Sequence, residues 1–162
     1  MDAETNPDVS PLDEYKFQAA VLLPVLGTLR AELGEERANR LVLGALRDWS
    51  RRRWHRKGAR FPGGPREKWA ALMDETTRRL GSEVEIRVLR DDGEALECDV
   101  TRCAYAELFR QLGEIPLGLA LCCDDDFYIT EVGHPEVEMT RTTTLMEGAS
   151  RCDFRWRFRG SR

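Results

Sequence analysis

The stretch LCCDDDFYIT, residues 121–130, places two thiols directly before three carboxylates. If a helix ends near Cys123, the aspartates follow its negative end, where the helix dipole disfavours anions by roughly 0.3 to 1 kcal/mol each. Neighbouring carboxylates also raise the pKa of a thiol and oppose formation of the thiolate. We therefore expect Cys122 and Cys123 to be poor first choices as nucleophiles, and the aspartates, Asp125 among them, to be better candidates for a base, a proton donor or the partner of a cation. A solvated turn before Phe127 is the alternative.

The last predicted hairpin brings a thiol and a carboxylate together. Alternation of apolar and polar residues over 152–158 puts Cys152 on a face that we expect to be buried. A long partner strand over 137–147 would pair Glu147 with Cys152, and a thiol beside a base is the usual arrangement of an activated nucleophile. The same pairing places Arg141 on that face, roughly 20 Å along the strand at about 3.4 Å per residue. The alternative is a frayed strand end from which Glu147 reaches water.

Cys103 and His134 are further candidates. Cys103 falls in the first turn of a predicted helix, where backbone N–H groups favour a thiolate. His134 lies in a loop before the last hairpin and could act as an acid or base if that loop folds over the cleft; a solvated loop histidine is the alternative. A metal site made of the cysteines and Asp125 would need closely spaced ligand pairs, and the irregular spacing leads us to predict no metal.

An α+β fold is expected to position these residues. Helical spacing of apolar residues begins near Leu12, and Pro24 either kinks the first helix or marks where it begins. Two strands flank the turn Asp92–Gly93, with Cys98 on their buried face, and Thr101 is expected to cap the next helix. The remaining expected helices cover residues 35–57, 66–80, 102–112 and 116–123. The order of three helices, a hairpin, two helices and a hairpin predicts helices packed on one face of an antiparallel sheet.

Composition limits the class of protein. The chain has 162 residues, which fits a single domain; we expect a flexible tail over 1–11 and a catalytic domain over 12–162. The net charge of −4 argues against binding nucleic acid through a basic surface. No apolar run is long enough for a membrane span and the N-terminus does not resemble a signal peptide, so we expect a cytoplasmic protein that does not bind membranes. The odd number of cysteines, five, fits a reducing compartment without disulfides.

Several segments together resemble the L-2-amino-thiazoline-4-carboxylic acid hydrolase family. They are CAYAELFRQLG, LGLALCCDDD, RTTTLMEGASRCDFRW and, more loosely, LRAELGEERANRLVLGALRDW. The resemblance covers residues 17–158 and implies a small bacterial enzyme that opens a cyclic C=N ring by adding water, converting a thiazoline amino acid to a carbamoyl cysteine. Members of such families often act in natural-product pathways on changed substrates. The last hairpin is also similar to that of the 4-vinyl reductase domain, a small-molecule-binding module.

The resemblance assigns roles by position. The implied catalytic residues are Cys103, Cys122 or Cys123, Cys152, Asp125 and its neighbours, Glu147 and Asp153. Arg141 and Arg155 are expected to hold a substrate carboxylate, with His134 beside them. We predict Cys152 as the nucleophile, oriented or deprotonated by Glu147, with Cys103 second; a water activated by a carboxylate is the alternative. We expect no cofactor and a small-molecule substrate, and leave a homo-oligomer open. A non-catalytic small-molecule-binding module is the competing function.

Overall fold

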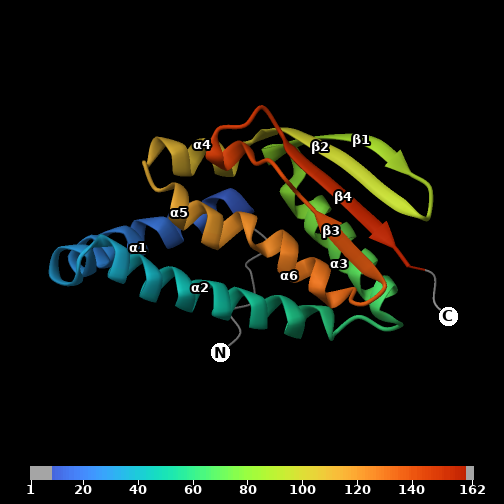
Figure 1. Cartoon of the computed structure of the whole chain (residues 1–162), viewed down its shortest axis with the longest axis horizontal. Helices are drawn as coiled ribbons and strands as arrows, with labels where there is room; N and C mark the ends of the chain where they lie inside the picture. The colour runs from blue at the N-terminus through green and yellow to red at the C-terminus, as the bar shows by residue number, and fades with distance from the viewer. Residues whose placement is uncertain (1–8, 160–162) are drawn as a thin grey trace.

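Helices cover one face of a four-stranded antiparallel sheet (Figure 1). The computed structural model describes residues 9–159, so most of the predicted tail lies outside the described residues. The described helices and strands, in chain order, are α1 (Pro11–Leu33), α2 (Glu35–Gly58), α3 (Pro65–Leu80), β1 (Val84–Asp91), β2 (Ala95–Cys103), α4 (Ala104–Gln111), α5 (Ile115–Gly118), α6 (Asp125–Val132), β3 (Val137–Thr140) and β4 (Cys152–Phe158). The strand order is β1-β2-β4-β3, and the predicted α+β class is confirmed.

Helix α1 begins one residue before the predicted start. Ser10 caps it by accepting a hydrogen bond from the backbone N–H of Asp13 at 3.1 Å. The helix continues past Pro24 and ends before Gly34, whose positive φ of 80° suits a residue without a Cβ. Pro24 therefore does not mark the beginning of the helix.

The inner face of the sheet has the alternation that the sequence predicts. Across β1, β2 and β4, Ile86 lies opposite Val100, and Val100 lies opposite Cys152. In the next inward row Cys98 pairs with Phe154. Cys98 is buried, as predicted for this face. The face packs against a helical layer that includes α3 and α6, so the thiols of β2 and β4 point toward the interior.

The predicted long strand over 137–147 is wrong. Strand β3 ends at Thr140, which pairs with Arg155, and a short 3-10 turn occupies Leu145–Glu147. The predicted pairing of Glu147 with Cys152 is therefore wrong as well. The cause is a tertiary contact, because the Asp153 carboxylate accepts backbone N–H groups of residues 142 and 143 and draws this segment away from the strand ladder.

Two further differences concern helix boundaries. Strand β2 continues to Cys103, so the helix expected to start near Arg102 begins at Ala104. After α5 the chain makes a π-helical turn, Leu119–Cys123, closed by a 2.9 Å bond from the Asp124 N–H to the Leu119 carbonyl. The aspartates then open α6, where the positive end of the helix dipole favours them. A helical turn does end at Cys123, as predicted, but the expected order of elements contained no helix after it, so α6 was missed.

Gly118 offers a direct test of packing between α5 and its neighbours. A Cβ at this position would lie 2.7 Å from Phe109 Cβ and from Met146 Cε, and the first of these atoms cannot move without the backbone. We expect Gly118→Ala to lower the free energy of unfolding by roughly 1 to 3 kcal/mol through overpacking. In contrast Gly44, within α2, has open space around it, and Gly44→Ala should stabilise by about 0.5 to 1 kcal/mol. Urea unfolding of both variants measures these changes, and equal changes in the free energy of unfolding would contradict the two predictions.

Candidate active site

A cavity of about 300 Å³ lies between the inner face of the sheet and the helices. All five cysteines of the chain line it, although they are scattered over the sequence. The residues of its wall that can carry out chemistry are Tyr15, Cys98, Cys103, Tyr105, Cys122, Cys123, Asp125, Asp126, Arg141 and Cys152. Most of the remaining wall is hydrocarbon, which keeps the local dielectric low and strengthens interactions between charges inside.

Cys152 is the thiol with the clearest set of hydrogen-bond partners. It is buried at the start of β4, and its Sγ accepts the backbone N–H of Leu145 at 3.2 Å. The same sulfur lies 3.6 Å from Oγ1 of the buried Thr144, which also lies 3.9 Å from the sulfur of Cys123. The Leu145 N–H directed at this sulfur can stabilise negative charge that develops on it during attack, so this position suits a nucleophile.

The other four thiols are held in their neutral form by burial. Desolvation raises the pKa of Cys98 and of Cys103 to about 11, and raises the pKa of Cys122 and Cys123 as well. At Cys103 the backbone N–H groups at the start of α4 act in the predicted direction and lower the pKa, but desolvation outweighs them. At neutral pH these cysteines therefore form polarisable surface of the cavity wall and do not supply thiolates.

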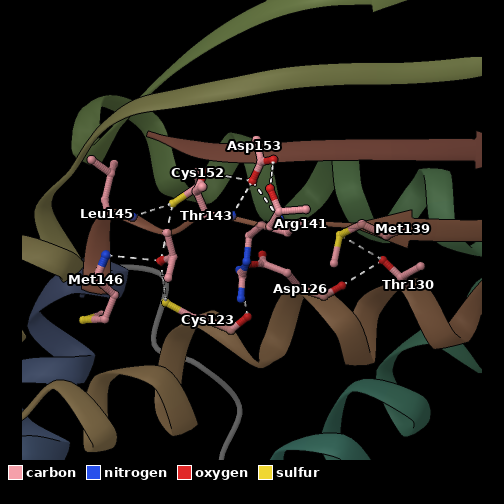
Figure 2. A network of polar contacts seen from close by, with 12 residues as sticks. Cys123, Asp126, Thr130, Met139, Arg141, Thr143, Leu145, Met146, Cys152 and Asp153 are labelled. Atoms are coloured by element: carbon pink, nitrogen blue, oxygen red, sulfur yellow. Dashed lines mark hydrogen bonds and ion pairs between the residues drawn. The ribbon is translucent and has the colours of Figure 1, made fainter. Parts of the chain in front are cut away.

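An ion pair between Arg141 and Asp126 lies inside the cavity wall. Nη1 of Arg141 donates to Asp126 Oδ2 at 2.7 Å and to the carbonyl of Cys123 at 3.1 Å (Figure 2). The Arg141 side chain is 7% exposed, whereas Asp126 keeps 35% of its side-chain surface accessible and lines the cavity. Desolvation raises the pKa of Asp126 to about 7, although the positive charge of Arg141 acts to lower it. A carboxyl group with such a pKa can both take up and release a proton near neutrality.

Asp125 faces a second polar cluster at the helical side of the cavity. Its carboxylate accepts a short hydrogen bond from the Ser50 hydroxyl, and its Oδ2 lies 3.4 Å from both the Tyr15 hydroxyl and Arg53 Nη2. Burial raises the pKa of Asp125 to about 6, although Arg53 and the Ser50 hydrogen bond counteract it. This acid is more enclosed than Asp126, being 4% exposed.

The raised pKa of Asp125 predicts a pH-dependent stability. The folded state holds the Asp125 proton up to about pH 6, while the unfolded chain releases it near pH 3.8. The stabilisation is complete below pH 3.8 and is lost as the pH rises through 6. We expect wild type to lose about 3 kcal/mol of unfolding free energy relative to Asp125→Asn across this range. Urea unfolding at a series of pH values measures it, with the exposed Asp74→Asn as control; parallel curves for wild type and Asp125→Asn would contradict it.

Local sequence explains how these groups reach the cavity. The π-helical turn widens the helix so that the consecutive residues Cys122 and Cys123 both line the wall. On the opposite side, Asp153 accepts hydrogen bonds from Thr142 and Thr143, which lie at the surface. Desolvation opposes ionisation of Asp153, but these hydrogen bonds lower its pKa below the ordinary range. They fix the segment that carries Arg141 into the cavity wall.

The structure does not bring every predicted residue to this site. Glu147 is exposed and lies outside the cavity wall. Arg155 binds Asp99 at 2.9 Å and backbone carbonyls, and it too lies outside the wall. His134 is exposed after α6. Cys152, Cys103, Cys123, Asp125 and Arg141 do line the same cavity.

Sequence reasoning missed Asp126 and Thr144 as individual site residues. Both lie beside residues that were selected, and only the helix that begins at Asp125 determines which aspartate faces Arg141. Nothing in the sequence distinguishes the buried Thr144 from the two exposed threonines that precede it. Within residues 9–159, no group of three or more histidine, cysteine, aspartate or glutamate side chains is arranged to hold a metal ion.

Fold and site together define a small α+β protein with a sheltered, thiol-lined cavity for a small molecule. The chain belongs to the L-2-amino-thiazoline-4-carboxylic acid hydrolase family, whose model matches residues 14–156. A comparison with curated proteins gave no match. None of the helices in residues 9–159 combines the length and hydropathy that a bilayer crossing requires.

Proposed function

We propose that this protein is a hydrolase that opens a small cyclic C=N substrate of the thiazoline type, with Cys152 as its nucleophile. Family membership supports the substrate class. The single observation that supports the chemistry best is the position of Cys152, whose sulfur receives a backbone N–H inside a cavity that also holds the Arg141–Asp126 pair.

In the first step the Cys152 sulfur attacks the carbon of the ring C=N bond. The thiol proton passes to ionised Asp126 and from there to the ring nitrogen, which receives the electron pair of the C=N π bond. The product of this step is a tetrahedral adduct joined to Cys152. An Asp126 pKa of about 7 matches the task, because the carboxylate must take up a proton and release it within one turnover.

In the second step a nitrogen lone pair re-forms a C=N bond, the ring C–S bond breaks, and the leaving ring sulfur takes up the proton that this nitrogen releases. The former ring carbon remains on Cys152 as an isothiourea. A water then attacks this carbon and gives one proton to the isothiourea nitrogen and the other to the Cys152 sulfur, which is expelled as the carbonyl forms. The net change is the addition of one water to the substrate. Arg141, held in place by Asp126 and the Cys123 carbonyl, is suited to bind the substrate carboxylate during both steps.

The test is incubation of the full-length protein with 2-amino-thiazoline-4-carboxylic acid, followed by mass spectrometry. We expect a product heavier than the substrate by one water and carrying a newly released thiol. Calorimetric binding of the compound without conversion would instead support the competing function, a small-molecule-binding module without turnover. An absence of both binding and conversion would contradict both functions for this substrate class.

A further inference from the structure

The cavity extends well beyond the groups that the proposed chemistry uses. We propose that it also contains a binding slot for an apolar substituent on the substrate ring, an inference that rests on the proposed function. The slot lies between α3 and the inner face of β1 and β2. It is formed by Met73, Leu80, Val84, Ile86, Val88 and Leu96.

Strand register places this apolar slot at a defined distance from the nucleophile. Cys152 on β4 lies opposite Val100 on β2, and Val100 lies opposite Ile86 on β1. Adjacent strands are about 4.8 Å apart, so Ile86 lies roughly 10 Å from Cys152 along one row of the sheet. A hydrocarbon chain attached to a ring held at Cys152 could reach β1 by running across Val100.

Helix α3 supplies the opposite wall of the apolar slot. Thr76 and Thr77 lie three and four residues after Met73, and Leu80 lies four and three residues after them, so the four residues form one face, and all line the cavity. The six slot residues and these two threonines are uncharged, whereas Asp126 and Arg141 belong to the part of the wall next to Cys123. The cavity is therefore divided between a polar reaction end and an apolar end.

The apolar slot opens to solvent at the edge strand. Ile86 is 42% exposed and Val88 is 59% exposed, although both line the cavity. Apolar side chains left this accessible in a concave wall favour an apolar occupant. The apolar slot and the reaction end belong to the same cavity. We therefore assign the slot to a part of the substrate and not to a separate partner.

The size of the cavity agrees with a substituted substrate. A volume of about 300 Å³ is at the lower end of the range for drug-sized ligands. A thiazoline ring with its amino and carboxyl groups is considerably smaller and would leave the apolar slot empty. The substrate class that fits best is a cyclic C=N amino acid carrying a hydrocarbon chain on a ring carbon other than the reacting one.

The experiment compares 2-amino-thiazoline-4-carboxylic acid with its 5-methyl, 5-butyl and 5-hexyl derivatives. We expect KM to fall about fourfold for each methylene that becomes buried, until the chain reaches solvent past Val88. Val88→Asp should flatten this dependence, so that the ratio of kcat/KM between the hexyl and unsubstituted compounds falls toward one. Leu89→Asp is the matched control, because Leu89 is similarly exposed on the same strand but does not line the cavity.

Each outcome separates this inference from the proposed function. Turnover that is independent of chain length, or an equal dependence in Val88→Asp and Leu89→Asp, would overturn the slot while leaving the hydrolase intact. If no compound is hydrolysed, calorimetric affinities for the same series still test the slot. A dissociation constant that falls with chain length in Leu89→Asp but not in Val88→Asp supports it, and constants that stay flat in both overturn it.

Discussion

Replacing Cys152 by serine should abolish turnover of a thiazoline substrate, with a loss of at least about 10³-fold in kcat. The hydroxyl of serine is a far weaker nucleophile than a thiolate, and the Leu145 N–H that stabilises a sulfur anion cannot compensate for this. Substrate binding should persist, because the Arg141–Asp126 pair and the cavity wall are unchanged. Steady-state kinetics together with calorimetric binding to the variant measure both quantities.

The matched control for this variant is Cys98→Ser. Cys98 is buried in the same wall, and its pKa of about 11 keeps it protonated at neutral pH. We expect this change to cost much less activity than Cys152→Ser, since it removes no reacting atom. Similar losses in the two variants would indicate a packing effect and remove Cys152 from the role of nucleophile.

Replacing Asp126 by asparagine should lower kcat by about 10² to 10⁴-fold, the usual contribution of a positioned general base. In wild type, the carboxylate is the active form, so kcat/KM should fall about tenfold per pH unit as the pH drops below about 7. Asparagine does not titrate, and the variant should therefore lose this inflection. The measurement is a profile of kcat/KM against pH for both proteins.

Asp124→Asn is the control for Asp126→Asn. Asp124 is also partly buried and is paired with Arg47 at 2.6 Å, but it does not line the cavity. This variant should keep an inflection, shifted to somewhat lower pH, because the negative charge of Asp124 contributes to the raised pKa of Asp126. Circular dichroism of Asp126→Asn verifies that the protein remains folded with Arg141 deprived of its charged partner. A folded Asp126→Asn variant with the wild-type pH profile would exclude Asp126 as the base.

Elements with a regular period could be predicted from the sequence. Alternation over residues 152–158 identified the buried face of β4 and hence the inward position of Cys152, because side chains of a strand point to opposite faces in turn. Helical spacing located the long helices, because residues three and four positions apart lie on the same face of a helix. Both patterns are local, so they can be recognised in the sequence without knowing which elements pack against them.

Features created by distant contacts could not be predicted. Residues 141–147 are compatible with a strand, but the Asp153 carboxylate on the opposite strand and the bond of Arg141 to Asp126 hold the chain out of the ladder, and Glu147 lies exposed. Likewise, three consecutive aspartates suggest a solvated turn. Asp125 is buried because Ser50 and Arg53 on α2, more than 70 positions earlier, pack over it.

The most direct test of the account is chemical quenching during turnover, followed by mass spectrometry of the intact protein and its peptides. We predict a population of protein heavier by one whole substrate molecule, with the added mass on the peptide that contains Cys152. The adduct should be absent from Cys152→Ser and should decay as product forms. Product formation without any covalent adduct at Cys152, or with the adduct on a different cysteine, would contradict the central claim.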